Sequence, residues 1–119
     1  MRLEGVRILL VEDEPIIAMT AEDMLEEIGC RVVASAGALG DALAAAEQEG
    51  FDVALLDINL NGVDSYPVAA RLREDGRPFI FTTGYGPSGR DPAYADVPLV
   101  TKPYQLADLA SAIAKALGR

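Results

Sequence analysis

Polar residues at four separated places in this sequence have types suited to one reactive site. Asp57 ends the apolar run Val53–Leu56, and three carboxylates stand together at Glu12–Glu14. Thr83 and Lys102 each follow a further apolar run. Carboxylates gathered in one place raise one another's pKa unless a cation lies between them. Mg²⁺, a hard cation that prefers oxygen ligands and leaves room for a phosphate oxygen, suits such a group.

The strands that position these residues are predicted from short apolar runs. The run before Asp57 does not alternate with polar residues, which indicates a strand buried on both faces, as in a parallel sheet covered by helices. Ligands bind such sheets beyond the carboxyl ends of the strands, where Asp57 stands, although Asp is also common in ordinary turns. The other predicted strands are Arg7–Val11, Arg31–Ala36, Phe79–Phe81 and Leu99–Thr101.

Helices are predicted between these strands. Pro15 suits the first turn of a helix after the acidic run, and Gly29 is its expected stop. Ser65 is expected to cap another helix, with Pro67 in its first turn. Three Gly and three Pro between Gly84 and Pro98 allow only a short or irregular helix there. The predicted helices are Pro15–Ile28, Leu39–Gln48, Ser65–Glu74 and Gln105–Leu117.

This alternation of strands and helices predicts a doubly wound α/β fold, and the length fits one domain spanning residues 1–119 without an output domain. The formal net charge of −9 argues against binding nucleic acid or an anionic membrane surface. Neither a signal peptide nor a membrane span is expected, so the cytoplasm is the default location. Cys30 stands alone, and its expected role is that of a small buried hydrophobe. Without histidine, the chain has no imidazole base, nucleophile or metal ligand.

Four motifs together resemble response-regulator receiver domains, and they cover almost the whole chain. They are the run Leu10–Pro15, the turn Leu56–Leu60 with Gly62, the strand end at Thr83, and Thr101–Pro103. The resemblance implies a flavodoxin-like five-stranded parallel sheet in the order 2-1-3-4-5, with helices on both faces. It also implies a signalling protein of a two-component phosphorelay, rather than an enzyme.

The resemblance assigns the central role to Asp57. This residue is expected to accept a phosphoryl group from a phosphohistidine on a sensor histidine kinase or a histidine phosphotransfer protein. Asp13 and Asp57 are expected to bind Mg²⁺ directly, with the backbone carbonyl of Asn59 as a further ligand and Glu12 acting mainly through water.

Two further residues complete the site that the resemblance implies. Lys102 is expected to pair with the phosphoryl oxygens, and Thr83 to donate its hydroxyl to one of them. The bond between Lys102 and Pro103 is cis in the family. These roles agree with the chemistry, because phosphoryl transfer needs an aligned nucleophile and cations near the equatorial oxygens. An ionised aspartate suffices as nucleophile, so the missing histidine is no obstacle.

A narrower resemblance concerns Phe81–Gly86, which is similar to the Phe-Ala-Thr-Gly-x-Gly-Tyr group of commonly stand-alone receivers, with Thr82 replacing Ala. Leu99 occupies the strand position where most receivers carry a switching aromatic ring. We therefore expect phosphorylation to act through the loop Gly84–Pro98, as a bistable element that orders when Thr83 engages the phosphoryl group. The candidate switch and partner residues are Gly84, Tyr85, Gly86, Tyr94, Leu99, Pro103 and Tyr104.

Kinase choice in the family rests on the first helix and nearby loops, which here offer Ile16, Ile17, Thr20 and the loop of Tyr104. Whether the protein relays the phosphoryl group, drains it, or binds an effector stays open.

The sequence also bears on three other functions. A small aspartate phosphatase is weakly supported, because Asn59 stands where such enzymes carry a second Asp. A flavodoxin-like electron carrier would hold an anionic phosphate after the first strand, where Glu12–Glu14 would repel it. A binding module that works without phosphorylation stays open.

Overall fold

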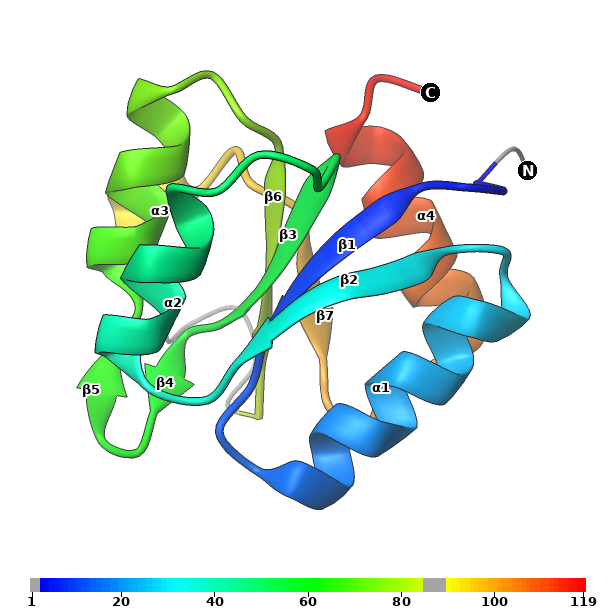
Figure 1. The fold of residues 1–119 in the computed structure, drawn as a ribbon, viewed down its shortest axis with the longest axis horizontal. Coiled ribbons are helices and arrows are strands. Elements are labelled where there is room, and N and C mark those ends of the chain that lie inside the picture. Colours follow the sequence, from blue (N-terminus) through cyan, green and yellow to red (C-terminus); the bar gives the residue numbers. More distant parts are fainter. Residues whose placement is uncertain (1–2, 85–89) are drawn as a thin grey trace.

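A parallel five-stranded sheet forms the centre of the molecule (Figure 1). The structure is a computed structural model and describes residues 3–84 and 90–119. Every neighbouring pair of strands in this sheet is parallel. In spatial order the strands are β2 (Arg31–Ala36), β1 (Arg7–Val11), β3 (Val53–Asp57), β6 (Phe79–Thr83) and β7 (Leu99–Thr101).

Four helices cover the two faces of the sheet, as the α/β pattern predicted (Figure 1). The second and third helices lie on one face, and the first and fourth lie on the other. The predicted strand order 2-1-3-4-5 is confirmed. The helices are α1 (Pro15–Glu27), α2 (Leu39–Ala46), α3 (Tyr66–Glu74) and α4 (Leu106–Ala116).

Burial on both faces explains why the central strands are continuous apolar runs. In β1, Ile8 and Leu10 belong to the core beneath α1 and α4, whereas Leu9 and Val11 belong to the core beneath α2 and α3. Successive strand residues point to opposite faces, so a strand covered on both sides needs an apolar residue at every position. Every residue of β3, including Asp57, is buried.

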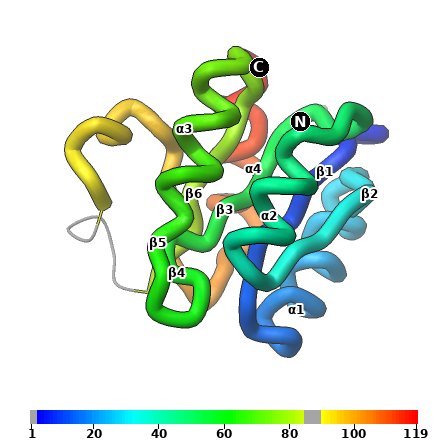
Figure 2. The backbone as a smooth tube through the Cα atoms, turned by 60° about the vertical axis from the view of Figure 1, so that its left-hand side comes forward, coloured from blue at the N-terminus to red at the C-terminus, as the bar shows by residue number. Residues whose placement is uncertain are grey.

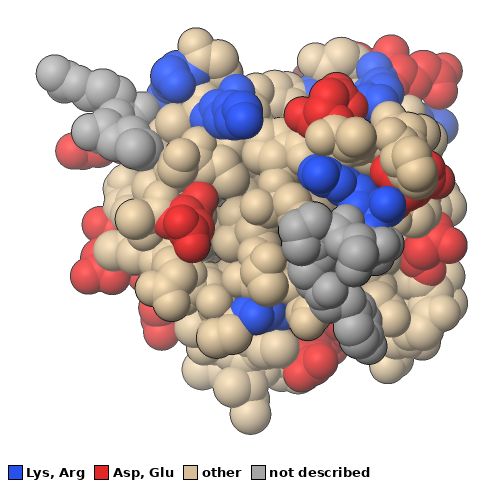
Figure 3. Space-filling view, turned by 180° about the vertical axis from the view of Figure 1, so that it is seen from behind, with Lys and Arg blue, Asp and Glu red and all other residues tan. Residues whose placement is uncertain are grey.

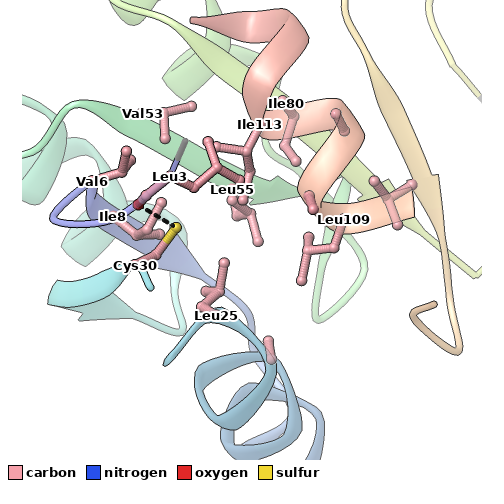
Figure 4. Close-up of a cluster of buried hydrophobic side chains, with 14 of the residues drawn as sticks. Leu3, Val6, Ile8, Leu25, Cys30, Val53, Leu55, Ile80, Leu109 and Ile113 are labelled. Carbon is pink, nitrogen blue, oxygen red and sulfur yellow. Dashed lines mark hydrogen bonds between the residues drawn. The ribbon is translucent and has the colours of Figure 1, made fainter. Parts of the chain in front are cut away.

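Cys30 is part of the core beneath α1 and α4, as the sequence predicted (Figure 4). It is 2% exposed, and its Sγ donates a hydrogen bond to the carbonyl of Leu3 over 3.7 Å. Burial raises the pKa of the thiol. The residue therefore behaves as a small hydrophobe rather than a reactive thiolate.

Pro15 at the start of α1 and Gly29 after its end agree with the residues predicted from the sequence. Glu14 is the N-cap residue and Pro15 opens the first turn, where its missing N–H is not needed. Gly29 follows the helix with a φ of +94°, a conformation that favours glycine. A Cβ at this position would also lie 3.0 Å from a side-chain atom of Glu4 and 3.1 Å from its Cα.

Two short strands after β3 were predicted only as a loop. They are β4 (Asn59–Leu60) and β5 (Val63–Asp64), an antiparallel hairpin at the end of the sheet where β1 and β3 finish (Figure 2). Asn61 and Gly62 connect them with φ values of 58° and 87°. A two-residue type I′ turn requires positive φ at both positions, and Asn-Gly is its preferred sequence.

The segment after β6 contains a single described 3₁₀ turn, η2 (Pro92–Tyr94), in keeping with the prediction of a short or irregular helix. The Asp91 carboxylate caps it by accepting a hydrogen bond from the Ala93 N–H over 2.9 Å.

Charged side chains on the surface are partly paired. Seen from behind, basic and acidic side chains are interspersed with uncharged surface (Figure 3). Among the described helices, none is long and apolar enough to cross a bilayer. The exposed ion pairs include Arg7–Asp52, Arg71–Glu47 and Arg73–Asp96.

Candidate functional site

The carboxyl ends of β1 and β3 bring three carboxylates together. Glu12 and Asp13 follow β1 directly, and Asp57 is the last residue of β3. Because these strands are parallel neighbours, their ends lie at one edge of the sheet. One carboxylate oxygen from each of the three residues lies within 4.8 Å of the other two. The structure therefore assembles the acidic cluster that the sequence predicted.

Lys102 reaches this cluster from the end of β7. Its Nζ donates a hydrogen bond of 2.7 Å to Oδ2 of Asp57. The same Nζ lies 2.7 Å from Oε1 of Glu12, as an ion pair outside hydrogen-bond geometry. Glu12 is 5% exposed and Asp57 is 4% exposed. The peptide bond between Lys102 and Pro103 is cis.

The electrostatics of the cluster follow from burial and pairing. Burial raises the pKa of Asp57 to about 7, against the opposing hydrogen bond and charge of Lys102; the charge of Glu12 adds to the rise. For Lys102, burial lowers the pKa, but the contacts with Asp57 and Glu12 outweigh it and the pKa rises. The lysine is therefore a fixed positive charge, whereas Asp57 is costly to ionise.

The donor set fits a divalent cation. Glu12 Oε1 is buried, and no described residue donates a hydrogen bond to it. Three carboxyl groups face one ammonium, so acidic groups outnumber basic ones in the cluster. Carboxylate oxygens are the ligands that Mg²⁺ prefers. The cluster of Glu12, Asp13 and Asp57 has the oxygens and the charge for such an ion.

Backbone N–H groups orient the carboxylates. Asn59 donates to Oδ1 of Asp57 over 3.2 Å, and Glu14 donates to Oε2 of Glu12 over 3.1 Å. Asn61, at the tip of the β4–β5 hairpin, donates to Oδ2 of Asp13 over 3.0 Å. From the sequence, Asn61 was expected only as a turn former and not as part of the site. Its Asn-Gly turn was the available signal, but only the fold shows that this turn reaches Asp13.

Thr83 lies at the same edge of the sheet, as predicted. It is the last residue of β6 and is 3% exposed. Its carbonyl accepts a hydrogen bond of 2.8 Å from the backbone N–H of Lys102, which ties the ends of β6 and β7 together.

A cleft of about 530 Å³ opens over the cluster. Its lining combines charged residues of the cluster, such as Asp13 and Asp57, with apolar residues such as Ile17 and Pro103. Glu12 and Thr83 are buried and do not line it. The residues that line it are Asp13, Glu14, Ile17, Thr20, Asp57, Asn59, Gly84, Lys102, Pro103 and Tyr104.

The predicted switch residues divide between the two faces of the sheet. Leu99 and Tyr94 pack against the core beneath α2 and α3, whereas Tyr104 packs against the core beneath α1 and α4. Burial raises the pKa of Tyr104 to about 12. Ile16, a predicted partner residue beside the cleft, is 79% exposed. The predictions for Tyr85 and Gly86 fall outside the described residues.

The sheet order and this cluster define the class of the protein. The sequence model of the response regulator receiver domain matches residues 8–114. The chain belongs to this family, whose members work in two-component systems.

Individual relatives agree with this assignment. The transcriptional regulatory protein TcrA of Mycobacterium tuberculosis is 36% identical over 115 residues, which are 91% of this chain and 44% of TcrA. The chain therefore spans less than half of that curated relative.

Two solved structures share the fold over nearly their full length. SdrG of Sphingomonas melonis is 40% identical with a TM-score of 0.85, over 95% of this chain and 97% of SdrG. The receiver domain of the sensor histidine kinase PA1611 of Pseudomonas aeruginosa is 27% identical with a TM-score of 0.81, over 97% of this chain and 99% of that domain. That structure contains a magnesium ion coordinated in its active-site cleft.

Proposed function

We propose that this chain is a phosphorelay receiver that accepts a phosphoryl group on Asp57. The observation that carries the proposal is the position of Lys102 Nζ, 2.7 Å from both Asp57 and Glu12 at the end of the sheet. This arrangement sets a nucleophilic carboxylate beside a fixed positive charge in a buried site, as phosphoryl transfer requires.

In the proposed reaction, a carboxylate oxygen of Asp57 attacks the phosphorus of a phosphohistidine on a partner protein. The P–N bond breaks, the imidazole nitrogen keeps the electron pair, and that nitrogen takes up a proton from solvent. The product is an acyl phosphate on Asp57. Lys102 then pairs with the new phosphoryl oxygens, and the hydroxyl of Thr83 donates to one of them.

The proposed magnesium ligands are Asp13, Asp57 and the backbone carbonyl of Asn59, with Glu12 acting mainly through water. The bound ion supplies positive charge for the phosphoryl oxygens. The oxygens of Glu12, Asp13 and Asp57, which lie within 4.8 Å of one another, support a cation at this position.

We also propose that the chain belongs to the Phe-Ala-Thr-Gly-x-Gly-Tyr group of receivers and signals through the loop Gly84–Pro98. The absence of an aromatic ring at position 99 supports this route. The later part of that loop packs on α3, where Tyr94 stacks on Tyr66 with ring centroids 5.4 Å apart. That contact gives the loop a defined docked state that a signal could stabilise or release.

The proposed partners are a sensor histidine kinase or a histidine phosphotransfer protein, followed by a downstream protein. Ile16 and Met19 support a docking surface on α1 beside the cleft, because they are 79% and 66% exposed. Large exposed apolar side chains on one helix face suit a protein partner.

The test compares wild type with Asp57→Asn by intact mass after incubation with Mg²⁺ and acetyl phosphate, and then with a phosphohistidine donor. Wild type is expected to gain one phosphoryl group and the variant none. Asp52→Asn, a substitution at a half-buried carboxylate outside the cluster, is the matched control and should be phosphorylated like wild type. A wild type that accepts no phosphoryl group from either donor would favour a binding module that works without phosphorylation.

The signalling route has a separate readout in amide NMR spectra before and after beryllofluoride. The proposal expects shifts that extend from Gly84 through residues 90–104. Shifts confined to the carboxylate cluster would leave phosphoryl acceptance standing and refute the loop as the signalling element.

A further inference from the structure

Gly37 lies in the connection between β2 and α2, directly against the backbone of Glu12 and Asp13. A Cβ built at this position would lie 3.3 Å from the backbone carbonyl oxygen of Glu12 and 3.7 Å from Cα of Asp13. The first distance is tighter than normal van der Waals contact, and both neighbours are backbone atoms that cannot rotate away. Only a glycine leaves this part of the turn undisturbed.

Gly37 does not have a conformational reason to be glycine. Its φ is outside the left-handed region, unlike that of Gly29 or Gly62. The reason for the missing side chain is therefore the close approach to Glu12 and Asp13, which carry two of the three carboxylates.

Neither Gly37 nor the Glu12–Asp13 backbone can move away from this contact without disturbing other interactions. The residue before Gly37 is Ala36, which is paired with Val11 in the sheet and accepts a hydrogen bond of 3.0 Å from the N–H of Glu12. This bond holds the two chains at their present separation. A shift of Gly37 away from the turn would break it or bend the end of β2.

The carboxylates are tied on the other side of the turn. Asp13 accepts the N–H of Asn61 over 3.0 Å, and the Oε2 of Glu12 accepts the N–H of Glu14 over 3.1 Å. A displacement of the Glu12–Asp13 backbone by a few tenths of an ångström therefore changes the position of the carboxylate oxygens as well. Metal sites are sensitive to such displacements of supporting groups.

We propose that Gly37 is a positioning residue for the magnesium site, because its missing side chain allows the Glu12–Asp13 turn to sit where its carboxylates meet Asp57. This inference rests on the proposed magnesium site. It extends that site to a residue of the β2–α2 connection that touches no ligand itself.

The test measures Mg²⁺ affinity of Gly37→Ala and wild type by amide NMR titration, with Asn61 as reporter because its N–H bonds Asp13. The expected result is a Kd raised roughly tenfold, the size of effect typical for supporting residues of metal sites. Gly40→Ala is the matched control, since a Cβ there meets no atom within 4 Å. Its Kd should equal that of wild type.

A second readout separates positioning from a general defect. The rate of labelling by acetyl phosphate should be lower in Gly37→Ala at limiting Mg²⁺ and should reach the wild-type rate when Mg²⁺ is raised to saturation. A deficit that saturating Mg²⁺ does not repair would overturn the inference.

Stability is measured in the same samples without Mg²⁺. Gly37→Ala is expected to stay folded at 25 °C, with an unfolding midpoint somewhat below that of wild type because the added Cβ crowds the Glu12 carbonyl. A variant that is unfolded at 25 °C would refute the inference, because the effect would then lie in the fold. A folded variant with wild-type Mg²⁺ affinity would refute it too and leave the proposed function intact. A wild-type protein that does not bind Mg²⁺ would refute both this inference and the proposed magnesium site.

Discussion

Lys102 Nζ and Asp57 Oδ2 lie 2.7 Å apart, although the two residues are 45 positions apart in the chain. The contact joins the ends of β7 and β3 and occupies the carboxylate on which the proposed chemistry depends. Without a divalent cation, Lys102 is the one positive charge among the described residues that pairs with Glu12 and Asp57. Stability and cation binding should therefore be coupled at this point.

Asp57→Asn is expected to stabilise the protein at neutral pH in the absence of Mg²⁺. Burial holds the pKa of Asp57 at about 7, above its ordinary value of 3.8. Between these two values the folded state keeps a proton that the unfolded state has lost, so wild-type stability falls as pH rises through this window. Above this pH window, Asp57 is ionised in both the folded and the unfolded state, and the folded state bears the full cost of burying the charge. The neutral amide avoids this cost, so the free energy of unfolding of Asp57→Asn should exceed that of wild type by about 1–3 kcal/mol.

Urea unfolding at pH 4 and pH 8 with a chelator checks this prediction. The gain from Asp57→Asn should be small at pH 4 and full at pH 8. Asp52→Asn is the control of opposite sign, because the hydrogen bond from Arg7 lowers the pKa of Asp52, and its loss should destabilise the protein at pH 8. A gain in stability from Asp57→Asn that did not vary with pH would contradict the raised pKa of Asp57.

Lys102→Met should weaken the fold and strengthen Mg²⁺ binding. Removing the ammonium leaves Glu12 and Asp57 buried without a counter-charge, at a cost of about 3–5 kcal/mol without metal. The same loss removes a positive charge that repels the cation, so Mg²⁺ affinity should rise roughly tenfold.

Thermal unfolding with and without Mg²⁺ measures both effects of Lys102→Met. Mg²⁺ should raise the unfolding midpoint of the variant by more than that of wild type. Lys115→Met, which removes an exposed lysine from α4, is the control and should show the wild-type response. Equal Mg²⁺ responses in wild type and Lys102→Met would mean that the lysine does not compete with the cation.

The sheet and most of the site could be predicted because they follow from local pattern. The apolar run before Asp57 indicated a strand buried on both faces, and parallel strands must bring their carboxyl ends to one edge. That rule alone placed Glu12, Asp13 and Lys102 around Asp57.

The features that the sequence did not reveal depend on contacts between distant loops. Asn61 and Gly37 meet Asp13 and Glu12 only after the fold is formed. The end of α2 differs for a smaller reason, since the helix stops at Ala46 two residues before the predicted end at Gln48. Those last residues are exposed, and their backbone closes into a turn.

Tyr66→Phe should loosen the segment after residue 90 with little change in global stability. The hydroxyl of Tyr66 accepts a hydrogen bond of 2.8 Å from the N–H of Asp91, while its ring stacks on Tyr94 and meets the edge of Phe81. The substitution keeps both rings and removes the acceptor, which costs about 1 kcal/mol locally. Amide exchange of residues 91–97 should accelerate several-fold.

Tyr94→Phe is the matched control for that experiment. Its hydroxyl has no hydrogen-bond partner among the described residues, and its ring keeps the contacts with Tyr66 and Arg73. Exchange in residues 91–97 should stay near the wild-type rate. If both variants exchanged equally fast, the Asp91 hydrogen bond would not be what holds this segment.

Ser65→Ala should leave stability unchanged or raise it, although Ser65 occupies the N-cap position of α3. The predicted side-chain cap is wrong: the hydroxyl makes no cap hydrogen bond, and the residue is 0% exposed. Its Oγ is buried without a partner among the described residues. Loss of a working cap costs about 1 kcal/mol, whereas loss of a buried unpaired hydroxyl removes a desolvation penalty.

Urea unfolding of Ser65→Ala and Asp91→Ala distinguishes the two kinds of cap. Asp91 makes a real cap hydrogen bond to the Ala93 N–H at the start of η2, so its substitution should destabilise that turn and accelerate its amide exchange. Ser65→Ala should shift the unfolding midpoint upward or not at all, because the backbone of Ser65 still bonds Ile58 and Val68. A loss of about 1 kcal/mol in Ser65→Ala would show that the hydroxyl caps α3 in solution.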